Sequence, residues 1–146
     1  MRAFFFVNLK KINSMKLLSN YPTEVLVLLF LIVTFLQSGI DKLLDWKGNV
    51  SFISDHFKNS PLKNSVPLLL AVILILEIIA GLLMLFGVYQ LYTSGVKEIA
   101  LLGVELCAVV LIFLLIGQRL AKDYAGAMSL AVYFIITLWG VFLLNS

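Results

Sequence analysis

The chain has 146 residues, enough for one domain, and 62% of them are hydrophobic whereas 13% are charged. A soluble domain usually carries about 25% charged residues, and a soluble protein of this size has too little interior to hide so much apolar surface. The net charge of +3 comes from basic residues spread before and between apolar segments, which excludes a nucleic-acid-binding patch and is typical of membrane proteins.

The N-terminal segment, residues 1–23, carries basic residues around an apolar patch at 4–7 that is too short to cross a bilayer. Met15 provides a second plausible start of translation after Met1. The residues that follow, 24–144, predict a single membrane domain.

Four apolar runs predict transmembrane helices within this domain, at residues 24–44, 66–88, 97–117 and 125–144. Each has about 20 residues, which at 1.5 Å per residue crosses about 30 Å of hydrocarbon. The runs do not alternate between polar and apolar residues, which excludes a β-barrel. No small-residue cleavage site follows the first run, so we expect it to be retained. The sequence therefore predicts an all-α fold, an integral membrane four-helix bundle.

The link between the first two spans, residues 45–65, is the only long one. Its apolar residues recur at helical spacing as Trp46, Val50, Ile53 and Phe57, with polar residues on the other faces. We predict a short amphipathic helix that lies in the membrane interface; a plain soluble loop is the alternative. The links at 89–96 and 118–124 predict tight hairpins. Basic residues are nearly balanced between the two ends of the spans, so the positive-inside rule does not choose an orientation.

Two carboxylates interrupt the apolar spans, Glu77 in the second and Glu105 in the third. An ionised side chain at this depth is costly and is often functional. Gln37 and Tyr133 lie on polar stripes of the first and fourth spans, and a bundle that turns these stripes inward would bring all four side chains together. We predict from them a protonatable intramembrane site for a small polar or quinone-like ligand. The alternative is that both glutamates are neutral and only hold neighbouring helices together.

Other polar residues lie at the ends of the spans. Asp41 and Lys42 end the first span, where we expect both to reach water. Gln118 and Arg119 belong to the polar turn before the last span, which we interpret as a solvated hairpin. The single cysteine, Cys107, and single histidine, His56, exclude an internal disulfide, a four-cysteine cluster, a bis-histidine haem and a zinc site of ordinary spacing. No metal site and no cofactor motif is evident in the chain.

Three stretches carry a resemblance to a known family. They are FLQSGIDKL at 35–43, EIIAGLL at 77–83 and GQRLAKDY at 117–124, and their distinctive residues are Gly39, Lys42, Glu77 and Gly81. With these stretches the chain resembles the DoxX family of small membrane proteins over residues 24–144. The resemblance implies a four-helix bundle in a bacterial inner membrane. Some relatives are subunits of a thiosulfate:quinone oxidoreductase and others associate with redox enzymes.

Three functions are consistent with these features. The first is a DoxX-like membrane component of a redox system, with a quinone among Glu77, Glu105, Gln37 and Tyr133 and with electrons supplied by a redox-enzyme partner. The second is a small transporter or ligand-binding membrane protein. So short a transporter would have to form a homo-oligomer. The third is a structural or assembly partner of a membrane complex, in which small residues mediate helix contacts.

Overall fold

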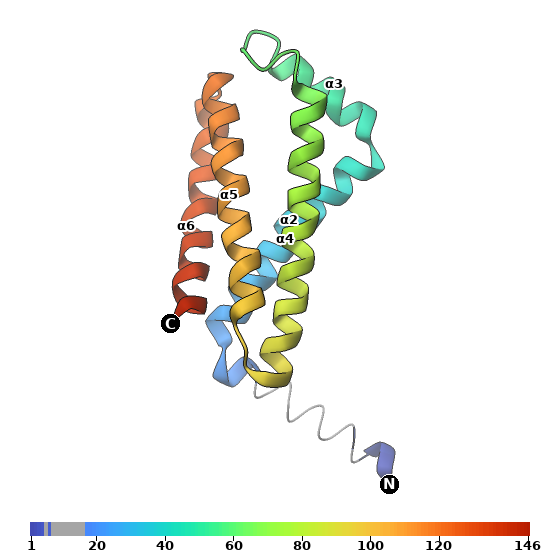
Figure 1. Cartoon of the computed structure of the whole chain (residues 1–146), viewed down its shortest axis with the longest axis vertical. Helices are drawn as coiled ribbons and strands as arrows, with labels where there is room; N and C mark the ends of the chain where they lie inside the picture. Colours follow the sequence, from blue (N-terminus) through green and yellow to red (C-terminus); the bar gives the residue numbers. More distant parts are fainter. Residues whose placement is uncertain (5, 7–16) are drawn as a thin grey trace.

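The computed structural model describes residues 1–4, 6 and 17–146, and its described residues contain helices and no strand (Figure 1). The helices are α2 (Pro22–Leu44), α3 (Trp46–His56), α4 (Val66–Ser94), α5 (Glu98–Leu120) and α6 (Tyr124–Asn145). Within the described part, α2, α4, α5 and α6 are long and apolar enough to span a membrane. The predicted all-α four-helix membrane fold with a short helix in the first link is confirmed. The alternative start at Met15 lies outside the described residues.

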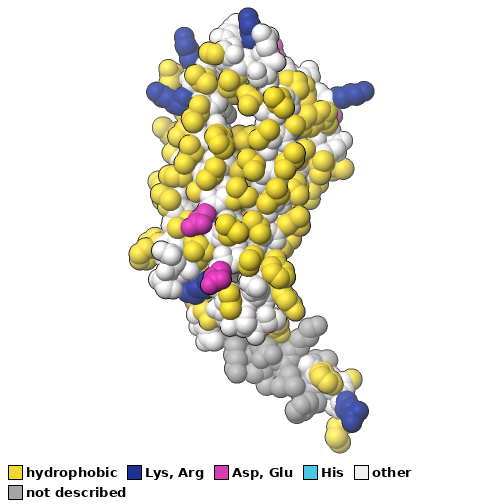
Figure 2. Space-filling model, viewed as in Figure 1, with side chains coloured by type: hydrophobic (Ala, Val, Ile, Leu, Met, Phe, Trp, Pro, Cys, Tyr) yellow, Lys and Arg dark blue, Asp and Glu magenta, His cyan; other side chains and the backbone are white. Residues whose placement is uncertain are grey.

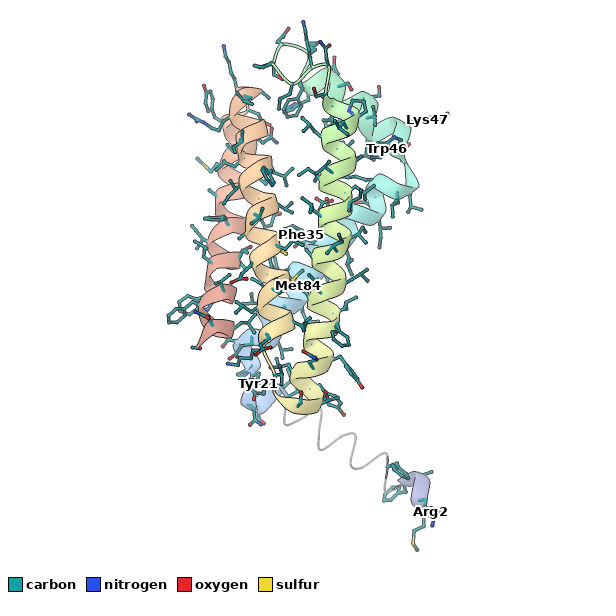
Figure 3. All side chains as sticks on the ribbon, in the orientation of Figure 1. Arg2, Tyr21, Phe35, Trp46, Lys47 and Met84 are labelled. Carbon is teal, nitrogen blue, oxygen red and sulfur yellow. The ribbon has the colours of Figure 1, made fainter. Side chains whose placement is uncertain are left out.

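The bundle is built around α4 and α5, which pack against each other; α2 packs mainly on α4, and α6 packs mainly on α5. In Figure 1, α2 runs obliquely behind α4. Phe35 and Met84 lie between the helices in the middle of the bundle (Figure 3), and both are buried. Figure 2 shows hydrophobic side chains over the length of the spans, with lysine and arginine near the ends. This is the surface that lipid requires.

The helix α4 is longer than its apolar run. It continues through Tyr89 and Tyr92 to Ser94 and ends at Gly95, whose φ of 70° is left-handed and favours glycine. The predicted hairpin at 89–96 is therefore wrong in extent, since most of it is helical. Polar and aromatic residues at a helix end suit the membrane interface, so the loss of hydrophobicity marked the edge of the bilayer and not the end of the helix.

The short helix α3 is capped at its N-terminus by Asp45, whose side chain accepts a hydrogen bond from the Gly48 amide at 3.1 Å. It contacts α2 and α4 and rises beside the first turns of α4 (Figure 1). Trp46 is half-buried, whereas Lys47 is exposed. The amphipathic helix is thus confirmed, and its place in the membrane interface remains a prediction.

The opposite end of the bundle is held by Lys97, just before α5. Its Nζ lies 3.4 Å from the Glu24 carboxylate of α2 and 3.4 Å from the backbone oxygen of Leu143 on α6. The ring of Tyr21 lies 5.5 Å from the same ammonium group. One lysine therefore ties together three helices, at the end of the bundle where Tyr21 lies, opposite α3 (Figure 3 labels Tyr21).

Candidate functional site

A buried ion pair joins α2 to α4. Lys42 Nζ lies 2.9 Å from Glu77 Oε2, and the two side chains are only 13% and 4% exposed. Ser38 completes the group, because its hydroxyl accepts a hydrogen bond from Lys42 at 2.6 Å and donates one to Glu77 Oε1 at 3.0 Å. Charge-assisted hydrogen bonds of this kind are stronger than hydrogen bonds between neutral groups, and burial keeps water from competing for them.

Two glycines let the backbones of α2 and α4 approach at this point. A Cβ on Gly39 would lie 2.6 Å from Ile78 Cδ1, and a Cβ on Gly81 would collide with Leu36. Ser38 and Lys42 are one helical turn apart and therefore face α4 together. The residues that carry the family resemblance thus form one structural unit, with Gly39 and Gly81 making room and Lys42 and Glu77 making the bond.

Glu77, the acidic member of the ion pair, forms part of the wall of a pocket of about 450 Å³, which is within the range of small-molecule sites. Four helices contribute to its lining: Val33, Thr34, Phe35, Gln37, Ser38 and Asp41 of α2, Glu77 of α4, Leu111 and Leu114 of α5, and Leu130 and Tyr133 of α6. The polar groups come mainly from α2, and the leucines of α5 and α6 make an apolar wall. Val33, Gln37 and Asp41 are exposed, so the pocket opens to the outside of the bundle along α2.

Three of the four predicted site residues, Gln37, Glu77 and Tyr133, line this pocket. Among the described residues, the side-chain amide of Gln37 and the hydroxyl of Tyr133 make no hydrogen bond. Both groups are therefore free to form hydrogen bonds with a ligand in the pocket.

Glu105 does not belong to the pocket. It is exposed on the surface of α5, as is Glu98, which shares its stripe. The residues that α5 turns inward include Gly103 and Cys107, each two positions from Glu105, and a two-residue step in a helix points to nearly the opposite side. The expectation that the two buried carboxylates share one interior is wrong for this residue.

The expectation for Lys42 is also wrong, since its ammonium group turns inward to Glu77 and does not reach for water. The reason is the inclination of α2, which brings its last turns against the middle of α4 (Figure 1). Asp41, its neighbour in sequence, is exposed at the rim of the pocket, as expected of a helix-end residue.

The polar turn between α5 and α6 is linked to α3. His56 Nε2 lies 3.0 Å from Gln118 Oε1 and 3.3 Å from Asp123 Oδ2, so the turn is not only solvated, as interpreted from the sequence. Arg119 is exposed and its guanidinium lies 4.8 Å from the centre of the Tyr124 ring. Gln118 and Arg119 do not line the pocket. Cys107 is buried beside Met84, where it fills space between α5 and α4.

Sequence reasoning missed Ser38 and Lys42 as the partners of Glu77. The signal was present, because a serine, a glycine and a lysine follow one another within two turns of α2, and a buried carboxylate needs a cation. The sequence does not show at which level along α4 the end of α2 makes contact.

The family model described as DoxX matches residues 25–117 of the chain. The match covers nearly all of α2, the whole of α3 and α4, and most of α5, and it includes the Ser38–Lys42–Glu77 group. No curated protein and no solved structure shows a significant match.

Proposed function

The chain belongs to the DoxX family, and from this premise we propose that it is a component of a redox system in the bacterial inner membrane that binds a quinone-like ligand in the pocket along α2. The observation that supports the proposal most is the character of the pocket. Hydrogen-bonding groups without partners line an open pocket whose other wall is apolar, on the side of a bundle that lipid surrounds.

The side chains suit a quinone ring. A quinone presents two carbonyl oxygens at opposite ends of a flat apolar ring, so it needs donors and apolar walls. The Gln37 amide and the Tyr133 hydroxyl can each donate a hydrogen bond. Leu111, Leu114 and Leu130 offer surfaces against which the ring can pack.

A bound quinone would supply the redox chemistry, since it takes up two electrons and two protons to become a quinol. The chain has a single cysteine and a single histidine, which cannot hold a four-cysteine cluster or a bis-histidine haem. The electrons would come from a partner oxidoreductase.

The Ser38–Lys42–Glu77 group would hold a proton beside the ligand. The Glu77 carboxyl is a member of the pocket wall, whereas Lys42 lies behind it. Lys42 and Ser38 fix the orientation of the Glu77 carboxyl. This carboxyl can hold a proton that reaches the pocket wall. The exposed Asp41 carboxylate lines the same pocket.

Binding can be measured directly. Protein purified in a mild detergent and analysed by mass spectrometry is expected to carry a quinone. Tyr133→Phe and Gln37→Leu are each expected to weaken binding of a short-chain ubiquinone by about three- to tenfold, the usual net effect of one hydrogen bond. Ser129→Ala is the matched control, since Ser129 lies one turn from Tyr133 on α6 but outside the pocket.

Quinone-free protein whose variants all bind the short-chain ubiquinone equally would overturn the proposal. If the pocket variants behave like the wild type while one protein partner co-purifies in stoichiometric amount, an assembly role explains the chain better.

A further inference from the structure

Glu105 is a carboxyl group on the lipid-facing side of a membrane span. It lies two turns from Glu98, the first residue of α5, or about 10 Å along the helix. Among the described residues it makes no hydrogen bond and no ion pair. Figure 2 shows acidic side chains in the lower half of this face, among mostly hydrophobic side chains, with a basic side chain beside the lower acidic one.

Hydrocarbon is a poor solvent for this group. A charged carboxylate there costs several kcal/mol, and even a neutral carboxyl without a hydrogen-bond partner is unfavourable. The group is too far from the start of α5 for its short side chain to reach the interface. A partner outside the chain would therefore stabilise it.

The surface around Glu105 has the shape of a helix–helix interface. Its neighbours on the same face are apolar and exposed: Leu102 (51%), Val109 (44%), Ile112 (44%) and Ile116 (51%). Their positions alternate steps of three and four residues through Glu105, the repeat by which two helices pack side by side at a small left-handed angle. One polar residue within such an apolar repeat fixes the register of the two helices.

We propose that this face of α5 is the interface of a symmetric dimer of the chain, in which the Glu105 carboxyls of two copies hydrogen-bond to each other. A second copy is the partner that fits best, because a twofold axis brings the same residue of both copies together. A neutral carboxyl both donates and accepts a hydrogen bond, so two of them satisfy each other without a basic residue. No other group on this face is required.

The dimer does not depend on the proposed quinone site. The exposed residues of the pocket, Val33, Gln37 and Asp41, belong to α2, which packs on α4 and lies behind it in Figure 1. Pairing through the exposed face of α5 leaves these residues uncovered, and a failure of one proposal leaves the other standing.

Cysteine cross-linking in membranes tests the interface. Leu102→Cys and Val109→Cys are each expected to form disulfide-linked dimers under mild oxidation. Val132→Cys on α6 and Leu82→Cys on α4 are equally exposed controls and are expected to stay monomeric. The native Cys107 is fully buried, so the wild-type chain should not cross-link.

Glu105 variants then test the carboxyl pair. In the Val109→Cys background, Glu105→Leu is expected to weaken dimerisation by about five- to thirtyfold on dilution into lipid, the range found for polar contacts between helices of model membrane peptides. Glu105→Gln keeps a donor and an acceptor and is expected to dimerise like the wild type. Equal cross-linking at all four cysteine positions, no loss with Glu105→Leu, or cross-links from positions 102 and 109 only to a different protein would each overturn the proposal.

Discussion

Replacing Lys42 with methionine is expected to destabilise the bundle by about 3 kcal/mol or more, because it leaves the buried Glu77 carboxylate without its cation. Methionine fills a similar volume, so the effect comes from the lost charge and not from a cavity. Unfolding in mixed detergent micelles, followed by circular dichroism as the fraction of sodium dodecyl sulfate rises, gives the free-energy difference.

Two further variants separate the ion pair from general damage. The double variant Lys42→Met with Glu77→Leu removes both charges and is expected to recover most of the lost stability, since an apolar pair of similar volume can replace a buried ion pair. Lys47→Met removes an exposed lysine of α3 and is expected to change little. A single Lys42→Met variant as stable as the wild type would show that the pair does not hold α2 to α4.

Replacing Gly87 with alanine is expected to destabilise the contact between α4 and α5 by about 1–3 kcal/mol, the usual cost of an overpacked core. A Cβ at this position would collide with the backbone of Ala100, which cannot move aside as a side-chain end can. The same detergent titration measures the effect.

Gly117→Ala is the matched control for this prediction. A Cβ on Gly117 would lie 3.5 Å from the ring of Phe57, an ordinary contact. Alanine is favoured over glycine in a helix by about 1 kcal/mol, so this variant is expected to be neutral or slightly stabilising. If both alanine variants gain stability, the close approach of α4 to α5 is not as tight as described.

Both predictions concern what positions the candidate site. The contact between α2 and α4 places Glu77 in the pocket wall, and the contact between α4 and α5 sets the distance from Glu77 to the apolar wall of Leu111 and Leu114. A variant that loosens either contact should therefore also weaken ligand binding, even though neither Lys42 nor Gly87 lines the pocket.

The bundle itself was predictable from sequence because the hydrocarbon of a bilayer restricts which segments can cross it. A span needs a continuous apolar run of about 20 residues, and four such runs fix the helices within a few residues. The error came at the end of α4, where hydropathy falls at Tyr89 but the helix continues to Ser94 and stops at Gly95, whose backbone is left-handed.

The site was predictable only in part. Helical periodicity shows which residues of a helix share a face, but it does not show whether that face points into the bundle or toward lipid. The face of α5 that carries Glu105 points outward. Gln37, Glu77 and Tyr133 were found because polar residues in apolar spans are uncommon. The bond between Lys42 and Glu77 depends on how α2 inclines against α4, a tertiary feature that neither helix encodes alone.

The most direct test of the central claim is photo-cross-linking with an azido-quinone in membranes, followed by mapping of the labelled peptides by mass spectrometry. The expected result is label on α2 near Gln37 and on α6 near Tyr133, which disappears when an unmodified quinone is added in excess. Label spread over the exposed faces of α4 and α5, or label that excess quinone does not displace, would contradict a quinone site in this pocket.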